Sequence, residues 1–173
     1  MTSKNNNSVI FTTQLASDVN ALLQGVSSEQ LFILTDESTH KHCLPLLQTG
    51  GLFDSAQVYT MPNGDHYKTI ETVVDIWTFL GESGATRHSV LINVGGGVVT
   101  DLGGFVANTF KRGIRFINIP TTLLSMVDAA VGGKTGINFN GLKNEIGVIN
   151  PAQAVVICPD FLRSLDTQNL LSG

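Results

Sequence analysis

The sequence has little charge, few cysteines and no long apolar run, and each shortage excludes a class of protein. Only 14% of its 173 residues are charged while 42% are hydrophobic, a balance that excludes a disordered chain and indicates a well-buried core. Cys43 and Cys158 lie far apart without a Cys-x-x-Cys motif, which argues against a disulfide framework and a thiolate zinc site. No apolar stretch approaches the ~18 residues of a membrane span, and the polar start is unlike a signal peptide. We therefore expect a soluble cytoplasmic protein with no membrane partner.

Positive charge is scarce as well, except in one block. The net charge of −4 and the pI of about 5.4 argue against a nucleic-acid partner, which needs a basic surface. Yet 11 of the 18 glycines lie between Gly95 and Gly147, where the net charge is +2 while the remainder carries −6. Glycine lets backbone N–H groups approach a phosphate that Lys or Arg neutralises, so this block predicts an anion site. Glycines that merely mark turns would explain the clustering equally well.

Short apolar runs of strand length alternate with segments of helical periodicity along the chain. This alternation predicts parallel strands joined by right-handed crossovers, hence an α/β fold with a Rossmann-like, open, mainly parallel sheet flanked by helices. No repeat or interdomain linker is visible, so residues 1–173 form one domain. We expect strands over 9–12, 31–35, 57–61, 90–94, 115–119 and 154–158, a β-hairpin within 132–144, and helices over 15–23, 42–47, 69–80, 98–109, 121–126 and 161–165.

A glycine turn, Gly95-Gly96-Gly97, is predicted to join a buried strand to a helix. Such a turn directs an anion to the unpaired N–H groups at the start of the helix. It lacks the third glycine of a full GxGxxG motif, so alone it is a weak signal. The GKT sequence that ends at Thr135 is not a phosphate-binding Walker loop, because Asp128 stands where that motif requires glycine, and a nucleotide triphosphatase loses most of its support.

Asp101 and the pair Gly103-Gly104 follow within the same predicted helix. Asp101 falls in the predicted first turn, where its carboxylate either caps backbone N–H groups or contacts a ligand. Two glycines inside a helix cost about 1 kcal/mol each relative to alanine. One explanation is that they allow a flat ring or another backbone to approach the helix closely. The other is that they serve helix–strand packing, and both explanations stay open.

Three segments together resemble the 3-dehydroquinate synthase family: GGGVVTDLGGF (95–105), FKRGIRFINIPTTLLSMVDAAVGGKTGIN (110–138) and GLKNEIG (141–147). The resemblance covers nearly the whole chain. The unbroken GGKT and KN favour this branch over the other sugar-phosphate cyclases and the polyol dehydrogenases of the same superfamily. It implies a Rossmann-like N-terminal NAD domain followed by a helical C-terminal metal-binding domain that this chain lacks, in an enzyme that works as a homodimer.

The resemblance also implies a reaction. The family converts 3-deoxy-arabino-heptulosonate 7-phosphate to 3-dehydroquinate and phosphate in the shikimate pathway. NAD transiently oxidises a substrate hydroxyl and is regenerated, and a divalent metal, zinc or cobalt, polarises the substrate hydroxyls. The family's metal ligands, one Glu and two His, lie beyond this chain. The histidines present (His40, His42, His66 and His88) show no ligand spacing, so we expect no metal site in it.

The cofactor contacts that the resemblance implies run through the whole chain. Asp36 and Asp65 match acids that accept ribose hydroxyls, although Ser38 stands where the family commonly has Asn and Asp65 where it often has Glu. The glycine turn would line the pyrophosphate, and Asp101 would lie near the nicotinamide. The full cofactor set is Asp36, Asp65, Lys68, Gly96, Gly97, Val98, Asp101, Thr121, Thr122, Lys134, Lys143, Phe161 and Ser164, the last replacing the family's usual Thr.

For the substrate, the resemblance implies that Asp128 binds its hydroxyls and that Lys134 and Asn144 hold its phosphate. Arg112 matches an arginine that reaches the phosphate bound by the neighbouring subunit. A dianionic leaving group needs such point charges and fork-shaped donors, although a lysine in solvent is the ordinary alternative for Lys134 and Lys143. Lys111 and Arg115 have no matched role.

We expect this chain alone to bind NAD weakly and to show no turnover. Two other hypotheses remain open on the sequence. The first is that the chain is a freestanding NAD-binding module or regulatory partner. The second is that it belongs to a relative with different cyclase or polyol dehydrogenase chemistry.

Overall fold

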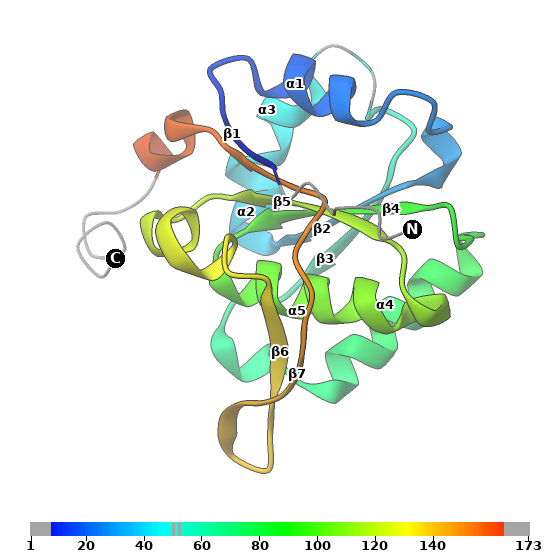
Figure 1. The fold of residues 1–173 in the computed structure, drawn as a ribbon, viewed down its shortest axis with the longest axis vertical. Coiled ribbons are helices and arrows are strands. Elements are labelled where there is room, and N and C mark those ends of the chain that lie inside the picture. The colour runs from blue at the N-terminus through cyan, green and yellow to red at the C-terminus, as the bar shows by residue number, and fades with distance from the viewer. Residues whose placement is uncertain (1–7, 50, 52, 165–173) are drawn as a thin grey trace, which may run out of the picture.

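The computed structural model describes residues 8–49, 51 and 53–164, and its centre is a six-stranded parallel sheet (Figure 1). The strands lie in the order β1-β8-β5-β4-β2-β3, and every pairing in this sheet is parallel. The expected fold class and all six expected strands are confirmed. Their bounds are β1 Ser8–Phe11, β2 Leu31–Asp36, β3 Gln57–Met61, β4 Val90–Gly95, β5 Arg115–Pro120 and β8 Ala154–Ile157.

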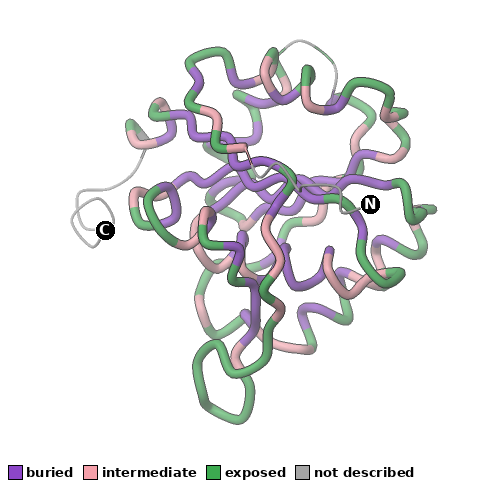
Figure 2. The backbone as a smooth tube through the Cα atoms, in the orientation of Figure 1, coloured by how far each residue is buried: buried purple, intermediate pink, exposed green. Residues whose placement is uncertain are grey.

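Helices cover both faces of this sheet. Figure 1 shows α1 (Leu15–Leu22) and α3 (Leu44–Gln48) on one face, with α4 (Ile70–Glu82) and α5 (Gly97–Thr109) on the other. Every residue of β4 and of β8 is buried, as is expected of strands with both faces covered. Figure 2 accordingly shows the buried residues concentrated in the sheet. Within the described residues, no helix combines the length and apolarity that crossing a bilayer needs.

The helix expected over 42–47 is found as α3, which begins two residues later, and a further short helix that was not expected precedes it. Helix α2 (Glu37–His42) begins earlier, since the Asp36 side chain accepts a hydrogen bond from the Thr39 N–H in a capping box. Helix α3 starts anew with Pro45 in its first turn, where proline is tolerated because the missing N–H has no intrahelical partner there. The capping box is thus the signal that the periodicity missed.

The remaining short turns carry several candidate residues. Their bounds are η1 Ser28–Gln30, η2 Asp65–Tyr67, η3 Phe110–Arg112, η4 Ser125–Ala129 and η5 Pro159–Ser164. The expected helix over 121–126 lies further along the chain, since η4 is a five-residue π-helical turn. The expected helix over 161–165 is the 3-10 turn η5, and Leu165 lies outside the described residues.

The expected hairpin is confirmed, although its second strand continues five residues past the expected end at residue 144, and the hairpin extends away from the sheet. It consists of β6 (Lys134–Phe139) and β7 (Leu142–Ile149), paired antiparallel beside α5 (Figure 1). Packing explains the two helical glycines. A Cβ at Gly104 would overlap the side chain of Thr135 in the hairpin, and a Cβ at Gly103 would overlap the side chain of Asn93 in the sheet. Helix α5 therefore lies very close to both neighbours.

Candidate functional site

The sheet order places a topological switch point between β2 and β4. The chain leaves β2 for β3 on one side and then returns to β4 on the other. In open α/β sheets, ligands bind at the carboxyl ends of the strands that flank such a point. Asp36 ends β2, and Gly95 ends β4. Two of the predicted cofactor segments therefore meet at this edge.

The glycine turn after β4 leaves the start of α5 open to an anion. Gly96 is the N-cap and supplies no capping side chain, and the first turn of α5 holds no acid, so its N–H groups and positive dipole end are not neutralised locally. A Cβ at Gly96 would lie 3.1 Å from Thr122 Cγ2, and the Thr121 N–H donates to Gly95 O at 3.0 Å. The segment after β5 thus packs closely against the turn. The glycine backbone without side chains, together with the N–H groups at the start of α5, is suited to binding a pyrophosphate.

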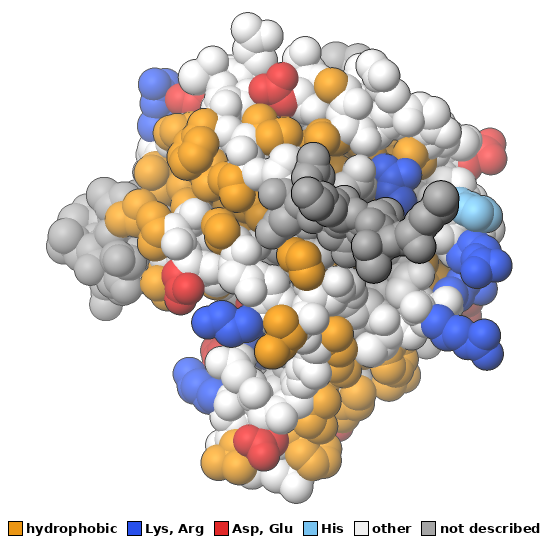
Figure 3. All heavy atoms as spheres, in the orientation of Figure 1, with side chains coloured by type: hydrophobic (Ala, Val, Ile, Leu, Met, Phe, Trp, Pro, Cys, Tyr) orange, Lys and Arg blue, Asp and Glu red, His pale blue; other side chains and the backbone are white. Residues whose placement is uncertain are grey.

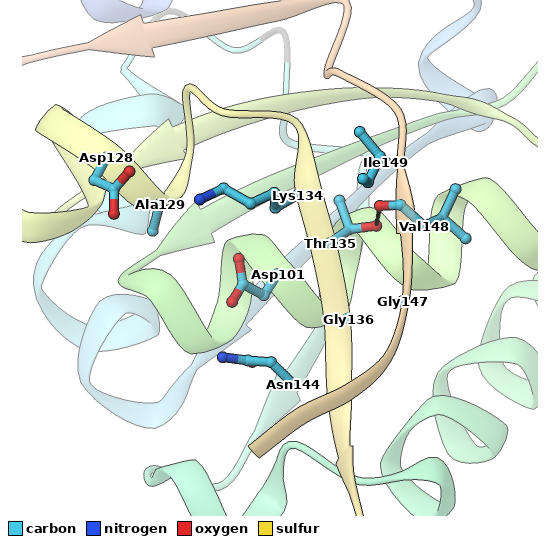
Figure 4. A pocket seen from close by; sticks show the side chains of 10 residues that line it. All are labelled: Asp101, Asp128, Ala129, Lys134, Thr135, Gly136, Asn144, Gly147, Val148 and Ile149. Carbon is cyan, nitrogen blue, oxygen red and sulfur yellow. Dashed lines mark hydrogen bonds between the residues drawn. The ribbon is translucent and has the colours of Figure 1, made fainter. Parts of the chain in front are cut away.

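A cavity of about 390 Å³ lies between α5, η4 and the hairpin, and its lining residue Ala129 would lie 3.5 Å from a Cβ at Gly97 of the turn. Figure 4 shows Asp101, Asp128, Lys134 and Asn144 around it. These four candidates come from α5, η4, β6 and β7, so the fold gathers residues from four separate elements. The rest of the lining consists of Ala129, Thr135, Gly136, Gly147, Val148 and Ile149.

Lys68 does not line this cavity itself but contacts two residues that do, Asp101 and Asn144. Its side chain is only 4% exposed, and its Nζ lies 2.6 Å from Asp101 Oδ2 and 2.5 Å from Asn144 Oδ1. Asp101 lies beyond the first turn of α5, so the alternative that it caps the helix is wrong, and it pairs with Lys68 instead. Burial raises the pKa of Asp101 above its ordinary value, although the ammonium groups of Lys68 and Lys134 oppose the rise.

Asp65 is the first residue of η2, and Lys68 directly follows this turn. Its Oδ2 lies 3.1 Å from Lys143 Nζ and accepts a hydrogen bond of 3.2 Å from Asn138 Nδ2. Burial alone would raise the pKa of Asp65, but Lys143, Asn138 and Lys68 together outweigh burial and lower its pKa below the ordinary value. The two predicted cofactor residues Asp65 and Lys143 are thus brought together, and both line a second hollow of about 410 Å³.

Other candidates have more local roles in this structure. The Oδ1 of Asp36 caps α2 by accepting from Thr39 N at 2.7 Å and from Thr39 Oγ1 at 2.9 Å. The side chain of Phe161 is in the core and only 1% exposed, which leaves its backbone for any contact. The side chain of Ser164 lies outside what the structure describes.

Arg112 is absent from the cavity that holds the other substrate candidates. It lines a separate hollow of about 760 Å³ with Arg87, His88 and Lys111, formed by the loops before β4 and β5, and so at the opposite edge of the sheet. Figure 3 shows Lys and Arg side chains beside a histidine at one edge of the molecule. Lys111 and Arg112 both have positive φ, of 48° and 69°, an arrangement that costs energy in residues other than glycine and often marks functional sites.

Three asparagines that the sequence motifs did not indicate form hydrogen bonds near the site. Asn138 donates to Asp65 through its side chain and to Lys68 O through its backbone N–H. Asn93 and Asn118 are buried neighbours in β4 and β5, and Asn118 Nδ2 donates to Ala130 O beside η4. An amide in the middle of an apolar strand costs free energy unless it is hydrogen-bonded. The asparagine within each of the apolar runs VLINVG and RFINIP was therefore the sequence signal that could have indicated a buried hydrogen-bonded pair.

His40 and His42 share helix α2, whereas His66 and His88 lie elsewhere in the chain. Among the described residues, no three His, Cys, Asp or Glu side chains gather in a way that could hold a metal ion. His40 Nδ1 shares a hydrogen bond of 2.8 Å with Thr60 Oγ1 at the surface. The part of the chain that the structure describes therefore offers no set of ligands for a metal centre.

The sheet order, the glycine turn at the switch point and the crossover helices define a Rossmann-like α/β domain. The sequence profile described as "3-dehydroquinate synthase N-terminal" matches residues 58–172. The chain is 51% identical to the 3-dehydroquinate synthase of Parabacteroides distasonis over 165 aligned residues. This alignment covers 95% of this chain and 47% of that relative. It is 45% identical over 152 residues to the 3-dehydroquinate synthase of Pyrococcus furiosus, covering 88% of this chain and 45% of that relative. The chain belongs to the 3-dehydroquinate synthase family and matches its N-terminal part.

A solved structure of another synthase shares the fold of this chain. The 2-epi-5-epi-valiolone synthase ValA from Streptomyces hygroscopicus subsp. jinggangensis, with NAD+ and Zn2+ bound, superposes with a TM-score of 0.82 at 27% identity. The match covers 98% of this chain and 47% of ValA. The chain thus spans about half the length of the relatives that it matches.

Proposed function

We propose that residues 1–173 are the N-terminal NAD- and phosphate-binding domain of a 3-dehydroquinate synthase. The complete enzyme would convert 3-deoxy-arabino-heptulosonate 7-phosphate to 3-dehydroquinate and phosphate. The observation that carries this proposal is the cavity beside the uncapped start of α5, where Asp128, Lys134 and Asn144 face the same hollow (Figure 4). The 51% identity with a relative of that name supports the choice of reaction.

The dinucleotide would lie across the carboxyl edge of the sheet. Its pyrophosphate would accept hydrogen bonds from the backbone at Gly96, Gly97 and Val98, where no Cβ of either glycine obstructs it. Asp36 at the end of β2 would accept ribose hydroxyls through the carboxylate oxygen that does not cap α2. The remaining contacts would come from Asp65, Lys68, Asp101, Thr121, Thr122, Lys134, Lys143, Phe161 and Ser164.

The substrate would occupy the 390 Å³ cavity beside the nicotinamide end. The chemistry that NAD+ would supply when bound is reversible oxidation: the hydride would leave the carbon that bears a substrate hydroxyl while the hydroxyl loses its proton, and both would be returned after phosphate has left. Asp128 would orient the hydroxyls of the substrate by accepting hydrogen bonds from them. Lys134 supplies a point charge and Asn144 a neutral amide donor, and both would bind the phosphate oxygens as negative charge gathers on the leaving group.

The metal implied by the family would be held outside the described residues, because they contain no ligand cluster. ValA has Zn2+ as well as NAD+ bound. We propose that the complete enzyme uses a divalent metal, zinc or cobalt, that this chain alone binds NAD weakly, and that it has no turnover. We place the complete enzyme in the cytoplasm.

Arg112 supports a homodimer. It is exposed and lies at the sheet edge opposite the glycine turn, so it lines a different hollow from Lys134. An arginine in that place would reach a substrate phosphate only in a neighbouring subunit. We therefore propose that each substrate site receives Arg112 from the second copy of the chain.

The decisive experiment uses the complete gene product with NAD+ and a divalent metal. Addition of 3-deoxy-arabino-heptulosonate 7-phosphate is expected to release inorganic phosphate and to form 3-dehydroquinate, with no net formation of NADH. Phosphate release only from other sugar phosphates would instead indicate a different cyclase. For the chain 1–173 alone, calorimetric titration of the folded protein with NAD+ is expected to show weak binding, and no detectable binding would contradict the cofactor assignment.

A further inference from the structure

Lys68 is almost completely buried beneath the proposed substrate cavity. Only 4% of its side chain is exposed, and an ammonium at such a site must be paired and hydrogen-bonded to offset the loss of its hydration. Two of its donors are used by Asp101 Oδ2 and Asn144 Oδ1. These acceptors belong to α5 and β7, so one side chain ties a helix to the hairpin.

This contact fixes the direction in which the Asn144 amide points. An ammonium group donates and cannot accept, so the atom of Asn144 that faces it must be the carbonyl oxygen. The amide nitrogen is thereby turned away from Lys68. Figure 4 shows this nitrogen beside the same hollow as the Lys134 ammonium.

The backbone at Asn144 is held by separate contacts. Its φ of 54° is in the left-handed region, which asparagine tolerates better than most residues. Its N–H donates to Asn138 Oδ1 at 3.0 Å, while the amide of Asn138 donates to Asp65 Oδ2 at 3.2 Å. The backbone is therefore set by Asn138, and the amide direction by Lys68.

Resting on the proposed function, we propose that Lys68 is a positioning residue for the phosphate site. It holds the carbonyl oxygen of Asn144 so that the amide nitrogen is presented, together with Lys134, to the phosphate of the substrate. Lys68 does not touch the phosphate in this arrangement. Its effect on phosphate binding therefore passes through Asn144, and this is a measurable property.

The test is a double-mutant cycle on the complete protein with NAD+ bound. The probe is inorganic phosphate, with its Kd measured by calorimetry and its inhibition constant by kinetics. Lys68→Met and Asn144→Ala are each expected to weaken phosphate binding about ten- to a hundredfold, the range for hydrogen bonds to charged groups. Lys68→Met in the Asn144→Ala background is expected to change the Kd less than about twofold, because the group through which Lys68 acts is gone.

Two further variants separate positioning from folding. Asn144→Asp keeps an oxygen for Lys68 but replaces the donor with a carboxylate that faces the phosphate, so it is expected to lose phosphate affinity at least as strongly as Asn144→Ala while remaining folded. If Lys68→Met does not fold, this variant still tests whether the side chain of Asn144 faces the phosphate, which the inference requires. Lys41→Met, which changes an exposed lysine on α2, is the matched control and is expected to bind phosphate like the wild type.

Three results would overturn the inference. They are an unchanged phosphate Kd in Lys68→Met, an equal loss from Lys68→Met in both backgrounds, and wild-type affinity in Asn144→Asp. A wild-type protein that forms no dehydroquinate but shows the predicted coupling in the phosphate Kd would contradict the proposed reaction and keep the role of Lys68. A wild-type protein that does not bind phosphate at all would contradict both.

Discussion

Gly104 of α5 lies directly against Thr135 of β6, with no space between them for a Cβ at position 104. Thr135 is buried, and its hydroxyl donates to Val148 O at 2.8 Å, across the hairpin. This hydrogen bond would have to break or bend if the Thr135 side chain turned away from α5. The hairpin that carries Lys134 and Asn144 is set against α5 by this contact.

Gly104→Ala is accordingly expected to lower the free energy of unfolding by about 1–3 kcal/mol, the usual cost of overpacking. The matched control is Gly81→Ala in α4, where a Cβ meets nothing within 4 Å. That substitution is expected to stabilise the protein by about 0.5–1 kcal/mol through the higher helix propensity of alanine. Urea unfolding of both variants measures the difference. Equal effects of the two substitutions would contradict the close packing.

Lys134 and Lys143 are expected to give opposite kinetic signatures in the complete enzyme. Lys134→Ala removes a charge from the phosphate cavity and should lower turnover about a hundredfold or more, a much larger effect than its loss of NAD affinity. Lys143→Ala removes the exposed partner of Asp65 and should weaken NAD binding several-fold, while turnover at saturating NAD stays within about threefold. Steady-state kinetics and NAD titration of both variants provide the measurement. If Lys134→Ala loses NAD affinity as severely as turnover, its assigned role is wrong.

Arg112 is expected to act across subunits, which a mixture of two inactive variants can reveal. Arg112→Ala and Lys134→Ala homodimers should each be nearly inactive. After subunit exchange, a mixed dimer has one site with an intact Lys134 that also receives an intact Arg112. About a quarter of the wild-type activity should therefore return in an equal mixture, as random pairing in a two-fold dimer predicts. No recovery despite proven exchange would contradict action across the interface.

Asp65 and Asp101 are expected to give stability opposite dependences on pH. The pKa of Asp65 is lowered on folding, since Lys143, Asn138 and Lys68 outweigh burial, so its contribution is present above about pH 4 and disappears as the pH falls through the folded pKa. The pKa of Asp101 is raised on folding by burial, so its contribution is present below about pH 4 and is lost as the pH rises through the folded pKa.

The measurement is urea unfolding of wild type, Asp65→Asn and Asp101→Asn between about pH 3 and 7. The stability advantage of the wild type over Asp65→Asn should shrink toward acid pH, and its advantage over Asp101→Asn should shrink toward neutral pH. Asp54→Asn, which alters an exposed carboxylate, controls for the loss of one surface charge. Parallel pH profiles for the two variants would be incompatible with these pKa directions.

The sequence by itself determined the secondary structure of the sheet and the location of the glycine-rich block. Apolar runs such as 31–35 and 90–94 predict buried strands because local patterning fixes which residues leave water. Helix starts that depend on a side-chain cap were harder, as α2 shows, because the apolar spacing carries no trace of the Asp36–Thr39 box. The family motifs named the site residues without placing them relative to one another.

Only the tertiary structure decided which of those residues act together. Lys68 meets Asp101 from 33 positions away and Asn144 from 76 positions away, and no local pattern encodes contacts at such separations. The same packing sends Arg112 to the opposite edge of the sheet, although only 16 positions separate it from Asp128. Local preferences set the elements, whereas the site depends on how closely α5, η4 and the hairpin pack, and that distance is set by the small side chains between them.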